Sequence, residues 1–435
     1  MARTARTAAL LAATTLTGLL ASPPAAYAEG VARPAGLDGS GECTFPMKKQ
    51  IEGVPWPLQR VLLDELWQDT KGKGVRVAVI DTGVDVVNKQ LAGAVDRKAG
   101  KDYLKPDKEN PGPGDSERGK TGGTKDEVGH GTKVAGIIAA RAVDGTGFVG
   151  LAPEATIIPI RQNDEKNSGK SDTMALAIDH AVAQRADVIN ISQDTAQPLG
   201  PNSKMGQAVA RAIKAGVVVV ASAGNDGVDG KDKFTYPAAF PGVLAVASSD
   251  RDNERAAFSQ SGPFVGVAAP GVDIVSTVPG GGQCVDNGTS FSAPYVSGVA
   301  ALLRAKHPDW TPAQIVTRIE QTAIRSINGH DRHVGWGVVD PVRALADGTD
   351  GTDGTGGAGG SDGNADTAPP SSPTPDPGPP KPPAPEPAHM AMSETPQERS
   401  ERLATYVLGI GAVLVAVVAG TAAVIRDSRR RRPLR

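Results

Sequence analysis

The chain has 435 residues, of which 46 are lysine or arginine and 48 are aspartate or glutamate, so its formal net charge at pH 7 is −2. This balance gives no indication of a basic surface for nucleic acid, and we expect no nucleic-acid partner. No metal-ligand cluster is evident in the sequence either, so we assign no metal-binding residues and expect no cofactor, and a calcium requirement stays open.

Residues 1–28 have the features of a secretory signal peptide. Arg3 and Arg6 precede an apolar stretch from about residue 8 to residue 20, and an Ala-Tyr-Ala motif ends at Ala28. The stretch is short and poor in large side chains, which disfavours a membrane span, although an uncleaved N-terminal anchor is the alternative. We therefore expect the main body of the protein to be extracytoplasmic.

Residues 29–54 form a short extension. A segment of about 25 residues cannot bury enough surface to fold alone, so we expect a strap that lies on the following domain. Whether this strap blocks a site or only lies beside it stays open. Residues 58–67 then have the pattern of a short amphipathic helix.

The chain contains two cysteines, Cys43 in the strap and Cys284. A signal peptide places both in an oxidising compartment, where disulfides persist, and we expect them to pair. Closing so long a loop would stabilise the fold by roughly 5 kcal/mol in the chain-entropy model. Two buried free thiols are the alternative.

Residues 75–81 form a continuous β-branched run that ends in Asp81, which predicts a buried strand with an acid at its carboxyl end. Taken alone, Asp81 is equally consistent with a loop carboxylate or with the aspartate of an aspartic protease. The aspartic protease is set aside because a chain of this length would need a second apolar-flanked Asp-Thr-Gly copy, and none is present.

Residues 91–128 are charged and rich in glycine, proline and lysine without a regular apolar period, which predicts an exposed loop. Such a loop would be solvated filler, or it would restrict the mouth of a site or bind a partner. It ends where His130, between two glycines, opens a predicted helix of small residues. By itself, His130 is no more than an ordinary helix-entry histidine.

Beyond His130, apolar runs at 156–160, 188–191 and 217–221 alternate with helical patterns at 172–185 and 203–215. This alternation predicts an α/β fold with a parallel sheet covered by helices on both faces. Ligands in such folds bind outside the carboxyl ends of the strands. Asp81 follows one such end, and Asn225 follows another.

Two further polar residues have the chemistry of a hydrolytic site. Asn225 is a turn residue by position, and its amide is also a suitable donor to a developing oxyanion. Ser290 stands at the start of a predicted helix, where backbone N–H groups and the helix dipole favour an anion. A serine N-cap is the alternative for Ser290 on its own. The chain order Asp81, His130, Ser290 is that of one known catalytic triad.

The segments VIDTGVD, GHGTKVAG, ASAGND and NGTSFSAPYVSG resemble the four signatures of the subtilisin-like serine proteases, over about residues 55–345. The resemblance implies a doubly wound subtilisin-like α/β domain and hydrolysis of peptide bonds in protein substrates. Asp81 would orient His130, and His130 would take the proton of Ser290 and return it to the leaving amine. Asn225 and the backbone N–H of Ser290 would hold the oxyanion.

The resemblance also implies that Ser192, Gln193 and Asp194 border the substrate. In the family the corresponding strand continues with small apolar residues and glycine, and its backbone pairs with an extended substrate. Asp194 stands where a glycine is usual, which changes the primary specificity pocket. This aspartate would favour a basic or small side chain, or it would simply face solvent.

The C-terminal part has a different composition. Residues 346–405 are rich in Gly, Asp and Thr and then in proline, which predicts a disordered linker. The uncharged run at 407–425 would span roughly 28 Å as a helix and predicts one transmembrane segment at 406–425. The basic tail at 426–435 would be cytoplasmic by the positive-inside rule. A buried core helix is the alternative for 406–425.

This order of parts is similar to that of the mycosins, membrane-anchored proteases associated with type VII secretion. The resemblance implies membrane components of that machinery as partners and its secreted proteins as substrates. A scaffold that stabilises a membrane complex, with dispensable protease activity, is the first alternative. The second is a general surface protease that degrades misfolded proteins.

Overall fold

The computed structural model describes residues 43–47, 50–106, 115–164, 168–325, 327–346 and 390. The predicted signal peptide, nearly all of the linker, the predicted span and the basic tail lie outside these residues. Within the described ranges, no helix combines the length and the apolar character that crossing a membrane requires.

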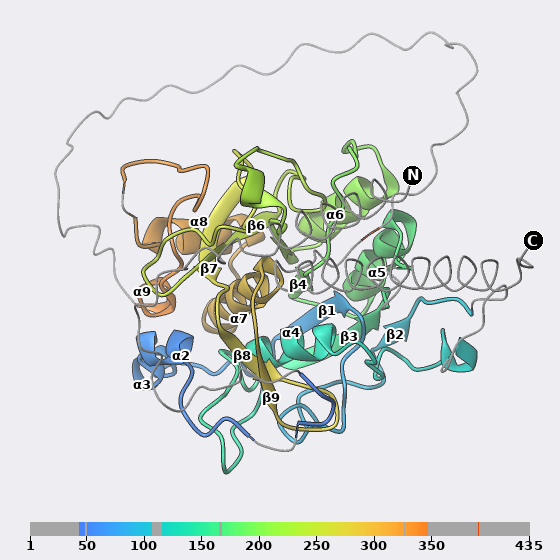
Figure 1. The fold of residues 1–435 in the computed structure, drawn as a ribbon. Coiled ribbons are helices and arrows are strands. Elements are labelled where there is room, and N and C mark those ends of the chain that lie inside the picture. The colour runs from blue at the N-terminus through green and yellow to red at the C-terminus, as the bar shows by residue number, and fades with distance from the viewer. Residues whose placement is uncertain are drawn as a thin grey trace, which may run out of the picture. The chain divides into compact units, whose positions relative to one another are not determined.

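A parallel β-sheet forms the centre of the described chain (Figure 1). Its seven described strands are in the order β2-β3-β1-β4-β5-β6-β7 and all pair in parallel. In chain order they are β1 (Arg76–Asp81), β2 (Lys101–Asp102), β3 (Thr156–Arg161), β4 (Val188–Ile191), β5 (Val218–Ser222), β6 (Leu244–Ser249) and β7 (Val265–Pro270). A separate antiparallel pair joins β8 (Ile274–Thr277) to β9 (Gln283–Asp286).

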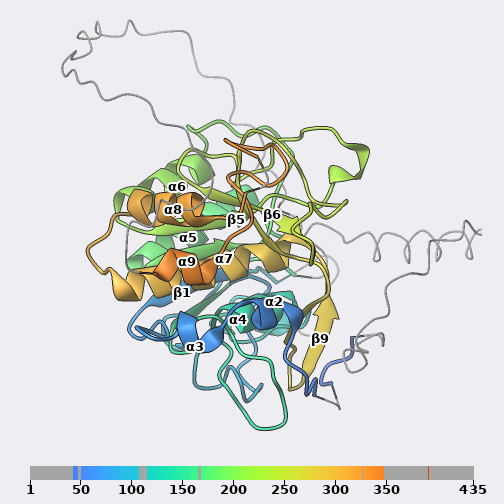
Figure 2. The ribbon, with the colours of Figure 1, turned by 90° about the vertical axis from the view of Figure 1, so that its left-hand side faces the viewer.

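Helices cover both faces of this sheet, which confirms the predicted α/β class (Figures 1 and 2). Helices α5 and α6 pack together on one face, and α4 and α7 pack together on the other. The described helices and 3-10 turns are α2 (Trp56–Arg60), α3 (Leu63–Leu66), η1 (Asp115–Glu117), α4 (His130–Ala139), α5 (Ser171–Ala183), α6 (Lys204–Lys214), η2 (Gly227–Asp229), α7 (Thr289–Lys306), α8 (Pro312–Thr322) and α9 (Pro341–Leu345).

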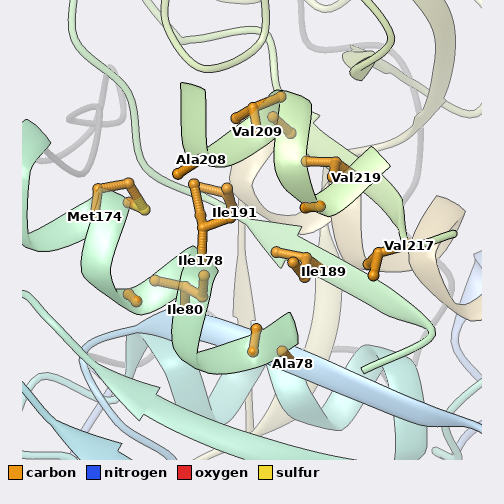
Figure 3. Packing of buried hydrophobic residues seen from close by; sticks show 14 of the residues in the cluster. Ala78, Ile80, Met174, Ile178, Ile189, Ile191, Ala208, Val209, Val217 and Val219 are labelled. Atoms are coloured by element: carbon orange, nitrogen blue, oxygen red, sulfur yellow. The ribbon is translucent and has the colours of Figure 1, made fainter. Parts of the chain in front are cut away.

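The core under α5 and α6 follows from the two-residue period of the strands. Alternate residues of β1, β4 and β5 point to this face, where Ile189 and Ile191 meet Met174 and Ile178 of α5 and Val209 of α6 (Figure 3). The intervening strand residues face α4 and α7. Because both faces are apolar, the strands appear in the sequence as continuous apolar runs rather than alternating ones.

The structure differs from the predicted elements in two places. Residues 58–67 form two short helices, α2 and α3, because Val61 adopts an extended conformation between them. The predicted exposed loop at 91–128 is partly buried: Leu91 is fully buried, and Lys101 and Asp102 add β2 to the edge of the sheet. Isolated buried side chains in a polar segment leave no periodic signal, which is why the pattern missed them.

The described part of the extension lies against β9 and its flanking turn. Cys43 and Cys284 form a disulfide with a Cα–Cα distance of 5.9 Å. The N–H of Met47 donates to the carbonyl of Gly281 at 3.0 Å, and the N–H of Ile51 donates to Oε1 of Gln283 at 3.0 Å. The Phe45 ring packs so closely on Gly129 that a Cβ there would collide with it. The extension therefore reaches the residue that precedes His130.

Candidate active site

The predicted site residues meet at one edge of the sheet because parallel strands place their carboxyl ends together. Asp81 is the last residue of β1, and Ser192 follows the end of β4. Asn225 lies three residues beyond β5. Ser290 is the second residue of α7, which packs against β4 and β5 from the other face.

Asp81 and His130 are joined by a hydrogen bond. Oδ1 of Asp81 lies 2.7 Å from Nδ1 of His130 and also accepts the N–H of Thr82 at 2.7 Å. The Asp81 carboxylate is fully buried, whereas 14% of the His130 side chain is exposed. The aspartate therefore fixes the imidazole from its buried side and leaves the opposite side of the ring towards solvent.

The environment of His130 favours the protonated imidazole. Burial lowers the pKa of His130, but the charge of the Asp81 carboxylate and its hydrogen bond raise it more, so the net shift is upward from the ordinary value. An imidazole that gains affinity for a proton in this way is suited to act as a general base.

Asp126 organises the entry to α4, a role that the sequence analysis missed. Its carboxylate accepts the N–H groups of Gly129 and Thr132, each at 2.8 Å, and the hydroxyls of Thr82 and Thr132. Burial raises the pKa of Asp126, while the hydrogen bonds oppose that rise. The available signal was an acid placed four residues before His130, where it satisfies free N–H groups at the helix start.

Ser290 is anchored to the neighbouring strand through its backbone. Pro294 lies inside α7 and has no N–H, so the carbonyl of Ser290 lacks its helical donor. The hydroxyl of Ser192 donates to that carbonyl instead, at 2.8 Å. In return, Oγ of Ser290 donates to the carbonyl of Ser192 at 3.3 Å. Because Pro294 leaves this carbonyl free, the start of α7 is linked to the residue that follows β4.

A buried relay of side chains supports this link. Nδ2 of Asn190 donates to Oγ of Ser192 at 3.0 Å, and Oγ of Ser297 donates to Oδ1 of Asn190 at 2.9 Å. All three side chains are buried. Asn190 therefore orients the hydroxyl that holds the Ser290 carbonyl, although its position inside a β-strand gave no functional signal.

Asn225 is held by the residue that precedes Ser290. Its Oδ1 accepts both the backbone N–H and the hydroxyl of Thr289, each at 2.9 Å. The oxygen of the amide is thus engaged by Thr289, and Nδ2 lies on the side of Gly288, 3.2 Å from where a Cβ of that glycine would stand. This arrangement sets the amide as a fixed donor beside the start of α7.

The predicted substrate-bordering residues are all buried and have different contacts. Ser192 is engaged with Ser290, and Oε1 of Gln193 accepts a hydrogen bond from Gln162. Asp194 does not face solvent: it is 9% exposed, and Oδ2 lies 3.0 Å from where a Cβ of Gly224 would stand. The described residues contain no group of three or more potential metal ligands. The site as a whole has the parts of a nucleophilic serine hydrolase.

Comparison with known proteins supports the same class over most of the described chain. The model of the subtilase family matches residues 72–337, and the chain belongs to this family. Subtilisin E from Bacillus subtilis (strain 168) is 36% identical over 297 residues, which cover 68% of this chain and 72% of the relative. The protein is therefore a subtilisin-like serine endopeptidase.

Mycosins are among the similar proteins. Mycosin-1 from Mycolicibacterium smegmatis is 34% identical over 342 residues, covering 67% of this chain and 72% of the relative. The solved structure of the MycP3 protease from the type VII (ESX-3) secretion system is 33% identical, with a TM-score of 0.58, and covers 68% of this chain and 89% of that one. A crystal structure of MycP1 from Mycobacterium smegmatis is 31% identical, with a TM-score of 0.58. The match covers 69% of this chain and 86% of that one.

Proposed function

We propose that this chain is a membrane-anchored, extracytoplasmic endopeptidase of a type VII secretion system, and that Asp81, His130 and Ser290 form its triad. The observation that carries the triad is the 2.7 Å bond between Asp81 and Nδ1 of His130, at the sheet edge that also holds Ser290 and Asn225. The hydrogen bond to Nδ1 leaves Nε2 of His130 as the base for the serine hydroxyl.

The reaction proceeds in two half-cycles. Ser290 Oγ attacks the peptide carbonyl while His130 takes its proton, and the imidazolium then protonates the leaving amine to give an acyl-enzyme. Water repeats the sequence and releases the acid. Asp81 stabilises the imidazolium in both halves, in keeping with the upward pKa shift of His130.

The oxyanion is bound by Nδ2 of Asn225 and by the backbone N–H of Ser290. The two donors are suited to this task because Thr289 holds the Asn225 amide through its oxygen and Ser290 lies at the free N-terminus of α7. The donors are oriented before substrate arrives, so little reorganisation is needed in the transition state.

The cellular part of the proposal rests on the sequence and on similarity to mycosins. The signal-peptide pattern at 1–28 and the apolar run at 406–425, followed by a basic tail at 426–435, support a single C-terminal span with the catalytic domain outside the cytoplasm. A relative from a type VII secretion system supports membrane components of such a system as partners and its secreted proteins as substrates.

A fluorophosphonate probe tests the triad on the full chain. We expect the wild type to be labelled, Ser290→Ala to be unlabelled, and His130→Ala to be labelled far more slowly. Ser292→Ala is the matched control, because this serine lies on the same helix and its hydroxyl contacts Ser248 instead. Labelling that persists in Ser290→Ala would remove Ser290 from the role of nucleophile.

The biological role is tested separately by complementation of secretion in a deletion strain. A secretion-linked protease predicts that Ser290→Ala loses processing of a secreted substrate and that casein is cleaved poorly. Restored secretion and processing with Ser290→Ala would favour the scaffold. Rapid, general cleavage of unfolded casein by the wild type would favour the surface quality-control protease.

A further inference from the structure

Met390 occupies a position that its place in the chain does not predict. It lies within the predicted linker at 346–405, far along the chain from Ala346, where a solvated side chain is expected. In the structure Met390 is 0% exposed and belongs to the apolar cluster that contains Met174 and Ile178 of α5. A methionine is suited to such a place because its unbranched side chain adapts to an irregular apolar space.

The backbone of Met390 is also paired on both sides. Its N–H donates to the carbonyl of Gly169 at 2.9 Å, and its carbonyl accepts Nδ2 of Asn163 at 3.2 Å. Oδ1 of Asn163 in turn accepts the N–H of Gly169 at 2.8 Å. Both partners lie between β3 and α5, so Met390 is held by its backbone donor and its backbone acceptor while its side chain lies in an apolar cluster, a combination of contacts that bound extended peptides also use.

The segment that receives Met390 is attached directly to the catalytic edge. The backbone N–H groups of Gln162 and Asn163 both point to the carbonyl of Asp81, at 2.9 and 3.3 Å. The side chain of Gln162 donates to Gln193, the residue that follows Ser192. Met390 is therefore bound to the segment between β3 and α5, which is hydrogen-bonded to Asp81 at the end of β1 and, through Gln162, to Gln193 beyond the end of β4.

One polar group that Gln162 connects to this segment has an unused donor. Gln193 is fully buried, its Oε1 is engaged by Gln162, and its Nε2 has no hydrogen-bond partner among the described residues. A buried N–H donor without a partner costs free energy. Binding a backbone carbonyl of an extended peptide at Nε2 of Gln193 would remove that cost. The position therefore has both the apolar and the polar features of a peptide-binding edge.

We propose that Met390 is a tethered occupant of the substrate-binding edge and competes there with peptide substrates. The position of Met390 is argued from its contacts, and the effect on peptide hydrolysis rests on the proposed endopeptidase function. Since the occupant belongs to the same chain, its effective concentration is on the order of millimolar for a flexible tether. Substrate must displace it, so the tether raises KM and leaves kcat unchanged.

Hydrolysis of a short peptide by the full chain tests the competition. Met390→Asp places a charge in an apolar site and should lower KM by on the order of 10- to 100-fold, the range expected from loss of one buried apolar side chain. Met390→Leu should stay close to the wild type because it conserves volume. Thr374→Asp is the matched control, with the same change of charge elsewhere in the predicted linker, and should behave as the wild type.

A second readout does not depend on catalysis. Photo-methionine incorporated into the Ser290→Ala chain should crosslink position 390 to peptides containing residues 163–169 or 171–183, and added substrate peptide should reduce the yield. The reaction is run at high dilution so that contacts within one chain dominate. Crosslinks from position 390 that avoid these peptides would overturn the proposal.

The two readouts separate the possible failures. If the wild type turns over no peptide but the crosslink forms and is displaced, the proposed function fails while Met390 still occupies the edge. If peptide is hydrolysed and Met390→Asp leaves KM unchanged, Met390 is not a competitor and the proposal is wrong. Cleavage of the wild-type chain next to Met390, seen as a change in intact mass, would make the segment a substrate and equally overturn it.

Discussion

The hydroxyl of Ser192 donates to the backbone carbonyl of Ser290 at 2.8 Å, a bond that replaces the one Pro294 cannot supply. In a regular helix the N–H four residues ahead would satisfy that carbonyl. Because of this proline, the carbonyl at the start of α7 is hydrogen-bonded to the residue after β4 and not to an N–H of its own helix. The position of the candidate nucleophile is therefore set by the residue that follows β4 and not by the helix alone.

This relationship predicts a double-mutant rescue. Ser192→Ala leaves the Ser290 carbonyl unsatisfied and should lower the free energy of unfolding by about 1–3 kcal/mol. In Ser192→Ala/Pro294→Ala, the new N–H at position 294 supplies the missing donor, so the loss should shrink by about 1 kcal/mol or more. Urea unfolding of the four proteins measures the coupling, and strict additivity would contradict the compensation.

Substitution of Asp81 tests the orientation of the imidazole. Asp81→Asn keeps the size of the side chain but presents the wrong partner to Nδ1 of His130, so kcat/KM should fall on the order of 10⁴-fold, as for the corresponding change in a known triad. The melting temperature should change much less than the activity. Peptide hydrolysis at pH 7, with Asp85→Asn as an off-site control, measures the effect; a loss below tenfold would exclude the orienting role.

The pH dependence of activity follows from the upward pKa shift of His130. Protonated imidazole cannot accept the serine proton, so kcat/KM should decline as pH falls through a pKa above the ordinary value of about 6.5. In Asp81→Asn this acid limb should move to lower pH, because the carboxylate charge that raises the pKa is gone. A pH profile of residual activity that keeps the wild-type midpoint would show that Asp81 is not the cause.

The same shift has an effect of opposite direction on stability. A raised folded-state pKa means that the folded protein binds the proton more tightly than the unfolded chain. The stabilising contribution of His130 is therefore complete below the unfolded pKa and is lost as pH rises through the folded pKa. On acidification, activity should therefore fall while the contribution of His130 to stability increases, and that contribution should be lost only on the alkaline side of the folded pKa.

Asn225 is expected to act in the transition state and not in substrate binding. Asn225→Ala should reduce kcat by 10²- to 10³-fold, about 2.7–4 kcal/mol, with KM little changed. Thr289→Val retains the backbone bond to Asn225 but loses the hydroxyl, so a smaller reduction is expected. Steady-state kinetics of both variants provide the check, and an effect of Asn225→Ala confined to KM would refute an oxyanion role.

The Cys43–Cys284 disulfide is expected to stabilise the fold without contributing to the chemistry. Opening it in Cys43→Ser/Cys284→Ser should cost about 2–5 kcal/mol. At roughly 2–4 °C per kcal/mol, the melting temperature should drop by about 5–20 °C. Fluorophosphonate labelling at 25 °C should survive. An unchanged melting temperature would mean that the contacts of the strap with Gly281 and Gln283 suffice alone.

The sequence by itself determined the fold class and the chemical parts of the site. Continuous apolar strands alternating with helices define a covered parallel sheet, and the polar residues Asp81 and Asn225 follow strand ends. The carboxyl ends of parallel strands lie at the same edge of a sheet. The order of strands and helices in the sequence is therefore enough to predict that these two residues lie near each other. The order Asp81, His130, Ser290 then indicates the chemistry.

Only the tertiary structure decided which groups hold those parts in place. Asp126, Asn190 and Thr289 act through hydrogen bonds across the fold, and a buried polar residue within a strand or beside a turn has no periodic signature. The donor that Pro294 lacks is supplied to the Ser290 carbonyl by Ser192, which lies 98 positions before Ser290 in the sequence. The burial of Met390 could not be predicted from the linker composition either. Its side chain lies in an apolar cluster that includes residues of α5, and its backbone is held by Asn163 and Gly169.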